Sequence, residues 1–195
     1  DTLTLVDIYL FDTASGGAGY AAEAGDHLPA ILEETLHLLQ HCPAVCERSC
    51  TKCLRHYGNR FWHNHLDRHL AAQLLLYARD GNLPAIPSLS EQATLLASFQ
   101  RFLELEGYQC LLNAPNRQGH MPLLVTSYPR TLAKSGPPIA IGLYPALLDP
   151  AISNVTHPLQ NSAKKDEARL VLLNDYIVAR DLPTAYQHFR QEAEQ

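Results

Sequence analysis

A mixed α/β (α+β) protein of two units is predicted by three observations. Strand-like and helical segments alternate along the 195 residues, four cysteines lie close together in the first half, and a stretch with two prolines follows them. We expect a cross-linked domain over residues 1–82, a linker over 83–90 and a small α/β module over 91–195. Because domains commonly hold about 100–150 residues, an apolar content of 46% allows one good core or two small ones.

The first domain is expected to run strand, glycine loop, helix, cysteine knot and helix. Alternating apolar residues predict the strand over 3–11, and apolar residues at helical spacing predict a helix over 21–39, with Pro29 at a break or in an early turn. After the cysteines, the pattern predicts a second helix over 61–79. The sequence Asp-Gly-Asn at 80–82 is expected to end it.

The second unit is expected to begin after the stretch NLPAIPSLS at 82–90. Ser90 would cap a helix that runs to about Glu106 and ends at Gly107. Short apolar runs separated by proline and glycine predict strands after this helix. The remaining expected elements are strands over 108–112, 122–127, 139–143 and 169–174 and a C-terminal helix over 183–194.

A group of cysteines in the order C-x3-C-x3-C-x2-C is the most specific feature of the chain. A thiolate binds Zn²⁺ at about 2.3 Å in a tetrahedron, and four sulfurs with no open position mark a structural rather than a catalytic site. Two flanking histidines, His41 and His56, are alternatives for one of the cysteines. We predict a zinc-stapled domain with one structural Zn²⁺ held by Cys42, Cys46, Cys50 and Cys53.

Disulfide bonds are the competing interpretation of these cysteines. A disulfide framework is typical of secreted chains with an even number of cysteines, whereas this chain holds five. The fifth, Cys110, lies in an apolar stretch and is expected to be a free buried thiol. The chain begins at Asp1 without a signal-peptide pattern, and no apolar run approaches the roughly 20 residues that cross a bilayer. We therefore expect a soluble, cytoplasmic piece of a longer protein.

Charge is distributed unevenly along the chain, whose net charge is −5. Residues 1–45 carry seven acids and no lysine or arginine, whereas residues 46–70 carry five basic residues and two acids. Four thiolates and one Zn²⁺ would add −2 to the second segment and leave it at about +1. Its basic side chains predict a weak nucleic-acid contact through Lys52, Arg55 and Arg60.

The glycine loop at 12–19 has two interpretations. Backbone N–H groups ahead of a helix attract anions, which would place Gly16, Gly17 and Gly19 against a DNA backbone. The loop lacks the Gly-Lys-Ser/Thr ending of a phosphate-binding P-loop, and its spacing does not fit a dinucleotide fingerprint. The favoured interpretation is a structural turn in which glycines permit positive φ, with the Asp12 carboxylate accepting hydrogen bonds from loop amides.

The sequence HNHLDRH at 63–69 nearly spells the metal-binding motif HxHxDH of metallo-β-lactamase-type hydrolases. On a helix, however, His65 and His69 would share one face and His63 and Asp67 another, whereas the hydrolase motif needs a loop to bring its ligands together. A second metal site is the less favoured interpretation. We expect instead that Leu66 and Leu70 are buried and that Asp67 and Arg68 make hydrogen bonds between this helix and the knot.

A nuclease is the main enzymatic alternative, because the second unit has the strand and helix order of a restriction-endonuclease-like core. Such enzymes hold Mg²⁺ with acids on adjacent strands, but the expected strands over 122–127 and 139–143 contain none. Asp149 and Asp175 are isolated in the sequence, and the His-x-Lys motif of phospholipase-D-type enzymes is missing. The sequence therefore predicts no catalytic residue, and an interaction module is favoured.

Three motifs together resemble a known family. They are FDTASGGAGY at 11–20, CPAVCERSCTKCLRHYGN at 42–59 and HNHLDRHLA at 63–71. In this order they resemble the MrfA-type zinc-binding domain at the C-terminus of superfamily 2 DNA helicases, which include repair helicases and phage-defence proteins of the DISARM and Druantia systems. The resemblance covers about residues 5–80.

What this resemblance implies is a zinc-binding accessory region of an ATP-dependent helicase, in which the four cysteines match the family's metal ligands. Its partners would be DNA, bound weakly through this piece, and motor domains upstream in the same chain or in a partner protein, with no membrane. Without a P-loop, the piece itself is expected to be non-catalytic. The alternatives are a metal-dependent nuclease or hydrolase and a protein-interaction module that uses the acidic N-terminal face.

Overall fold

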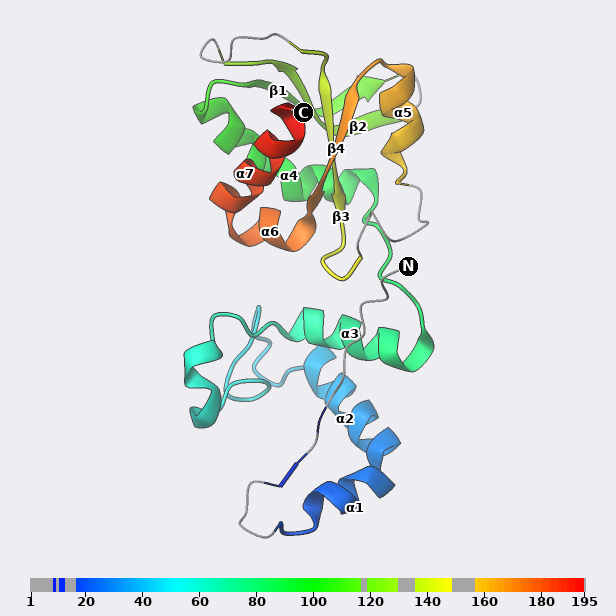
Figure 1. Ribbon diagram of the computed structural model, residues 1–195, viewed down its shortest axis with the longest axis vertical. Coiled ribbons are helices and arrows are strands. Elements are labelled where there is room, and N and C mark those ends of the chain that lie inside the picture. The colour runs from blue at the N-terminus through cyan, green and yellow to red at the C-terminus, as the bar shows by residue number, and fades with distance from the viewer. Residues whose placement is uncertain are drawn as a thin grey trace. The chain divides into compact units, whose positions relative to one another are not determined.

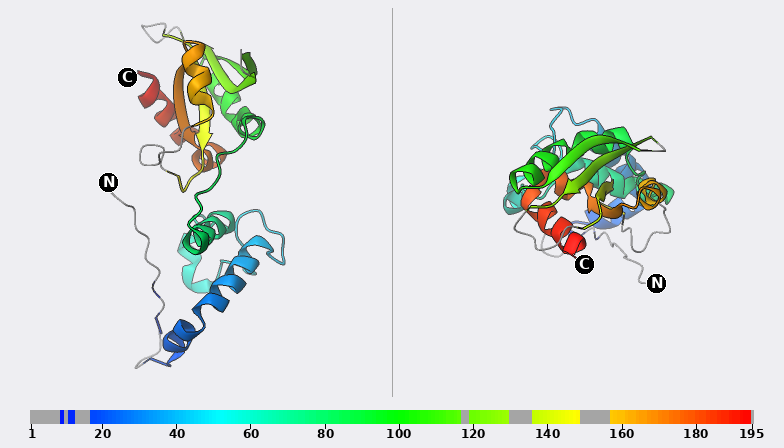
Figure 2. Two further views of the ribbon diagram at one scale, coloured as in Figure 1. Left: turned by 90° about the vertical axis from the view of Figure 1, so that its right-hand side faces the viewer. Right: turned by 90° about the horizontal axis from the view of Figure 1, so that it is seen from above.

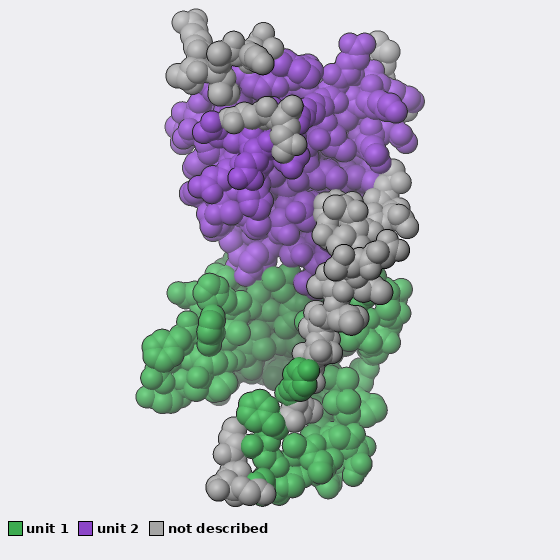
Figure 3. Space-filling model, viewed as in Figure 1, with its two compact units in different colours: residues 1–83 green, residues 84–195 purple. Residues whose placement is uncertain are grey.

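The computed structural model describes residue 9 and residues 11–12, 17–116, 119–129, 136–148 and 157–194. Most of the strand expected over 3–11 lies outside these residues. The chain forms two compact units, Asp1–Leu83 and Pro84–Gln195, which Figure 3 draws in different colours. In the described residues the mixed α and β character and the four-cysteine knot confirm the predicted fold class.

The first unit is built from short helices around the segment that holds the four cysteines, residues 42–54, which we call the knot (Figure 1). A break at His27 divides the helix expected over 21–39, and Pro29 lies in the first turn of the second part, where a proline costs no backbone hydrogen bond. The helices of this unit are α1 (Tyr20–Asp26), α2 (Leu28–Gln40), the 3₁₀ helix η1 (Tyr57–Trp62) and α3 (Arg68–Asp80).

The start of α3 corrects the prediction of one helix over 61–79. Asp67 is the N-cap of α3, and its Oδ1 accepts hydrogen bonds from the backbone N–H groups of His69 (2.9 Å) and Leu70 (3.2 Å). Residues 57–62 form η1 instead. Gly81, at φ 68°, ends α3 at the predicted Asp-Gly-Asn sequence.

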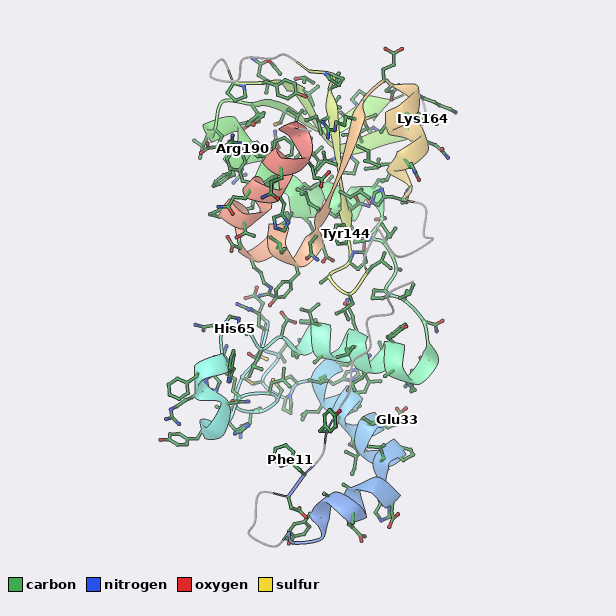
Figure 4. The ribbon with its side chains drawn as sticks, viewed as in Figure 1. Phe11, Glu33, His65, Tyr144, Lys164 and Arg190 are labelled. Atoms are coloured by element: carbon green, nitrogen blue, oxygen red, sulfur yellow. The ribbon has the colours of Figure 1, made fainter. Side chains whose placement is uncertain are left out.

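A small apolar core joins α2 to α3. The side chains of Leu36 and Leu39 on α2 and of Ala72 on α3 are buried together, and Leu54 of the knot packs against them. Arg79 of α3 also pairs at 3.0 Å with Glu33 of α2, which is labelled in Figure 4. The knot thus lies at one end of a two-helix hairpin.

The second unit is a four-stranded mixed sheet with helices on both faces. Strand order is β1-β2-β3-β4; the first three strands are antiparallel neighbours and β4 is parallel to β3. Its elements are α4 (Leu89–Leu105), β1 (Gln109–Asn116), β2 (Gly119–Ser127), β3 (Ile139–Tyr144), α5 (Leu159–Lys165), β4 (Arg169–Asn174), α6 (Asp175–Arg180) and α7 (Leu182–Glu194).

The main core of this unit lies between the sheet and α4, α6 and α7, whereas α5 covers the other face beside β3 and β4 (Figure 2). Phe99 of α4 and Phe189 of α7 meet edge to face with ring centroids 6.2 Å apart. A buried glutamine, Gln92, accepts from the backbone N–H of Leu143 at 2.8 Å and so connects α4 to β3. The opposite face has small side chains, since Ala140 of β3 packs near Ala163 of α5.

Helix α4 begins earlier than the sequence predicts. Ser88 rather than Ser90 is the N-cap: its Oγ accepts from the N–H of Glu91, and the Glu91 carboxylate accepts from the N–H of Ser88. This reciprocal pair is a capping box, and it places the first turn within the expected linker. No described helix is long and apolar enough to cross a membrane.

Candidate metal centre

The four cysteines lie on two tight turns after α2. In the first turn the N–H of Val45 donates to the carbonyl of Cys42 at 2.8 Å, and Val45 adopts a φ of 46°. This left-handed conformation is strained for a β-branched residue. In the second turn the N–H groups of Cys53 and Arg55 both donate to the carbonyl of Cys50, at 3.1 and 2.9 Å. The first turn brings the sulfurs of Cys42 and Cys46 together, and the second turn brings those of Cys50 and Cys53 together.

The spacing of the sulfurs fits a tetrahedral zinc ion. With Zn–S bonds of about 2.3 Å, the edge of a ZnS₄ tetrahedron is about 3.8 Å. Four sulfur–sulfur distances are 3.6 Å (Cys42–Cys50), 3.7 Å (Cys42–Cys46), 3.7 Å (Cys46–Cys53) and 3.9 Å (Cys50–Cys53). All four sulfurs lie within 4.8 Å of one another. These residues therefore have the geometry of a closed structural site.

Backbone amides around the knot favour negatively charged sulfur. The N–H of Cys50 donates to Sγ of Cys53 at 3.2 Å, and that of Lys52 donates to Sγ of Cys50 at 3.3 Å. Although desolvation opposes it, hydrogen bonds from the backbone of Ala44 and Cys46 lower the pKa of Cys42 to about 6. Desolvation and the neighbouring sulfurs raise the pKa of Cys46 to about 12. At this spacing, all four sulfurs can be negatively charged together only if a cation lies among them. Zn²⁺ supplies that positive charge.

A buried arginine holds the knot against the helical hairpin. Arg68, 8% exposed, donates to the carbonyls of Leu39 (2.6 Å) and Gln40 (3.1 Å) at the end of α2 and to that of Cys46 (2.8 Å) in the knot. Its backbone N–H donates to the carbonyl of Arg48 at 2.7 Å. The predicted role of Arg68 is thereby confirmed. Asp67 caps its own helix and lies 3.9 Å from Nε of Arg48, and Leu66 and Leu70 are only half-buried.

The histidines near the knot bind backbone groups. His69 Nε2 lies 3.0 Å from the carbonyl oxygen of Glu47, and His63 Nε2 lies 3.1 Å from that of His56. The ring of His56 accepts from the N–H of Gly58, and His41 Nδ1 lies 3.3 Å from the carbonyl oxygen of His37. Within the described ranges, the only group of three or more histidine, cysteine or acidic ligands that could hold a metal is the four cysteines.

The glycine loop is partly described. Gly17 and Gly19 have φ values of 73° and 79°, which favour glycine, and Gly19 is the N-cap of α1. Asp12 Oδ2 accepts from the N–H of Ala18 at 3.2 Å, as expected. Gly16 lies outside the described residues, and the contact of this loop with nucleic acid stays a prediction.

The three candidate basic residues have different surroundings. Lys52 is exposed, whereas Arg55 is half-buried and donates from Nε to the buried Ser49 at 2.9 Å. Arg60 is exposed and lies 4.4 Å from the ring centres of both Tyr57 and Phe61. The spacing of charges in the sequence does not reveal these aromatic neighbours, although aromatic and basic residues lie close together at 55–62. Arg55 is therefore partly structural, and Lys52 and Arg60 are the more available cations.

The described strands of the second unit lack the acids that would hold Mg²⁺ in a nuclease. Strands β2 and β3 hold no aspartate or glutamate, and Asp175 begins α6, where burial raises its pKa. Asp149 lies outside the described residues. Cys110 is half-buried on β1, where desolvation raises its pKa to about 12, so its thiol is protonated and unreactive at neutral pH.

These features define a structural zinc-binding domain followed by an α/β unit. Residues 4–54 match the family model described as the MrfA Zn-binding domain. The chain is also 37% identical, over 191 residues, to the Druantia protein DruE of Escherichia coli (strain UMEA 4076-1). The match covers 98% of this chain but spans only 10% of that relative. No solved structure matches the chain.

Proposed function

We propose that this chain is the zinc-stabilised accessory region of an ATP-dependent superfamily 2 DNA helicase in bacterial anti-phage defence. The observation that carries the proposal is the match to Druantia protein DruE, because it extends over both units rather than over the zinc-binding domain alone. The MrfA-type domain supports the helicase context, since the family that it resembles occurs at the C-terminus of such motors. A motor elsewhere in the longer protein would hydrolyse ATP.

The zinc centre would contribute architecture rather than chemistry. Its four sulfurs leave no open coordination position for a substrate or water. What the centre fixes is the position of η1 and of the basic residues beside it, with respect to α2 and α3. The nuclease alternative is disfavoured because β2 and β3 offer no carboxylate for Mg²⁺.

Zinc removal in the longer protein tests this function. In the full-length parent, Cys50→Ser is expected to abolish DNA-stimulated ATP hydrolysis, because the accessory region loses its fold. Cys110→Ser is the matched control, since its thiol lies in the other unit, and it is expected to retain the activity. Steady-state ATPase assays with and without DNA measure both variants. A parent without DNA-stimulated ATPase activity, or full activity in zinc-free Cys50→Ser, would reject the proposal.

A second prediction concerns the basic face of the knot. Replacing Lys52 and Arg60 by glutamine is expected to weaken binding of duplex DNA and to lower its salt dependence. Each phosphate that the protein no longer neutralises lowers the slope of log K against log salt by about 0.9, so two such phosphates lower it by about 1.8. Fluorescence anisotropy titrations of a labelled duplex between low and moderate salt measure this slope.

The control for this prediction changes the same number of charges elsewhere. Lys164 and Lys165 are exposed at the end of α5 in the second unit, and their double glutamine variant is expected to keep the wild-type slope. Equal slopes in all three proteins would show that this face does not bind phosphates and would assign it to a protein partner.

A further inference from the structure

An exposed aromatic patch lies on η1 and just after it. We define this patch as Tyr57, Arg60, Phe61, Trp62 and His65. The relative exposures of Tyr57, Phe61 and Trp62 are 81%, 79% and 64%. Three large exposed aromatic side chains within six residues are unusual, because such side chains are normally at least partly buried. The side chains of η1 extend away from the ribbon in Figure 4, which also labels His65.

The patch is held in a defined arrangement. The guanidinium of Arg60 lies 4.4 Å from the ring centres of both Tyr57 and Phe61, and the ring centres of Trp62 and His65 are 5.9 Å apart. In each contact a planar guanidinium or imidazole lies beside an aromatic ring. The patch therefore presents flat π surfaces in two groups, Arg60 with Tyr57 and Phe61, and Trp62 with His65.

The zinc knot fixes the backbone beneath the patch. Asn59 donates from Nδ2 to the carbonyl of Leu54 at 2.9 Å, and its Oδ1 accepts from the N–H of His56 at 2.9 Å. Gly58 packs closely on the His56 ring, since a Cβ at Gly58 would lie 2.9 Å from that ring. Such ordering before binding reduces the entropic cost of binding a flexible ligand.

Charge around the patch favours a polyanion. Residues 48–66 contain four lysine or arginine residues, three histidines and no acid. Residues 42–70, which contain all four zinc ligands, hold five lysine or arginine residues and two acids. With zinc bound, the four thiolates and the ion contribute −2, so this stretch keeps a charge of about +1 before any histidine is protonated. An acidic ligand with aromatic faces of its own fits both the charge and the rings.

Unpaired nucleotides are the ligand with these properties. In a duplex the faces of the bases are covered by their neighbours in the stack, whereas in a single strand they are free to stack on protein rings. Phosphates of the same strand would meet the cations beside the rings. An acidic peptide would satisfy the charge but would leave three exposed rings without a matching surface.

We infer that the aromatic patch is a base-stacking surface for single-stranded DNA, with Tyr57, Phe61 and Trp62 as the stacking residues. This inference rests on the proposed function and specifies which form of DNA the zinc-binding unit contacts. Arg60 positions Tyr57 and Phe61 and neutralises a phosphate. The patch thereby gives the unit a preference for unpaired over paired DNA that basic residues alone do not provide.

The test uses Trp62, the only tryptophan of the chain, as its own reporter. The zinc-loaded chain is titrated with a thymidine 20-mer, with an abasic 20-mer of equal charge and with a 20-base-pair duplex, and tryptophan fluorescence is followed. Stacking of a base on the indole is expected to quench the fluorescence with the thymidine strand. The abasic strand and the duplex are expected to quench far less.

A double variant separates stacking from charge. Tyr57→Ala with Phe61→Ala is expected to weaken binding of the thymidine strand at least about thirtyfold, because two bases can no longer stack on protein rings, with little change in salt slope. Tyr77→Ala, which removes an exposed ring from α3, is the control and is expected to bind like wild type. Zinc content, measured in each variant, identifies any that is misfolded, and Tyr57→Leu with Phe61→Leu then replaces it.

Three results would overturn the inference: no quenching by the thymidine strand, equal quenching by the abasic strand or the duplex, or wild-type affinity in the double variant. Such a failure is distinguishable from failure of the proposed function. If DNA-stimulated ATP hydrolysis in the parent still depends on zinc, the accessory role stands and only the stacking surface is rejected.

Discussion

Replacing Cys50 with serine is expected to remove zinc from the chain and to unfold residues 42–60. This segment has few apolar side chains of its own, so the metal supplies most of its stability; structural zinc sites contribute about 10–16 kcal/mol of apparent binding free energy in finger peptides at neutral pH. Elemental analysis is expected to give one zinc per wild-type chain and none in the variant, and hydrogen exchange is expected to show loss of protection in the knot.

Cys110→Ser is the comparison for this variant. Its sulfur lies on β1 in the second unit, so the zinc content is expected to stay at one per chain, with at most a small loss of stability in that unit. Retention of zinc by Cys50→Ser, or equal effects of the two substitutions, would show that the four cysteines do not act as one metal site.

Replacing Arg68 with methionine is expected to destabilise the first unit by about 3 kcal/mol or more. Methionine keeps the apolar stem but leaves the carbonyls of Leu39, Gln40 and Cys46 without their donor, and each unsatisfied buried acceptor costs about 1–3 kcal/mol. Arg68→Lys is expected to fall between wild type and methionine, because an ammonium lacks the planar fork that reaches both α2 and the knot. The midpoint of denaturant unfolding, followed through Trp62, reports on this unit alone.

Arg79→Met provides a matched control on the same helix. Arg79 pairs with Glu33 and Asp80, but its side chain is largely exposed, and exposed ion pairs contribute about 0–1 kcal/mol. The two substitutions remove the same chemical group and differ in burial and in the acceptors left behind. Equal shifts in the unfolding midpoint would contradict the role of Arg68 in holding the knot against α2.

Local patterns predicted much of this structure because they reflect local physics. The sulfur group could be predicted because four thiolates in so short a loop have few other uses, and the end of α3 because Gly81 readily adopts positive φ. The starts of helices were harder to locate. In the sequence, Asp67 is compatible with a helix interior or a metal ligand, whereas in the structure its carboxylate caps α3.

Other elements leave no recognisable apolar pattern in the sequence. Helix α6 follows β4 without a loop, because the side chain of Asn174 caps it immediately, and no apolar period in six residues reveals such a helix. The sequence does not reveal the aromatic patch for a related reason. Rings at 57, 61 and 62 are compatible with a buried helix face, and only the fold of η1 shows that they point outwards.

The bond from Arg68 to the carbonyl of Cys46 makes metal binding and helix formation thermodynamically linked. Arg68 lies fifteen positions after the last cysteine ligand, yet as the first residue of α3 it donates to the carbonyl of Cys46 in the knot. By reciprocity, bound zinc stabilises α3, and any change that favours α3 raises the affinity for zinc by the same free energy. The resistance of the bound zinc to a competing chelator is therefore also a measure of the stability of the α2–α3 hairpin.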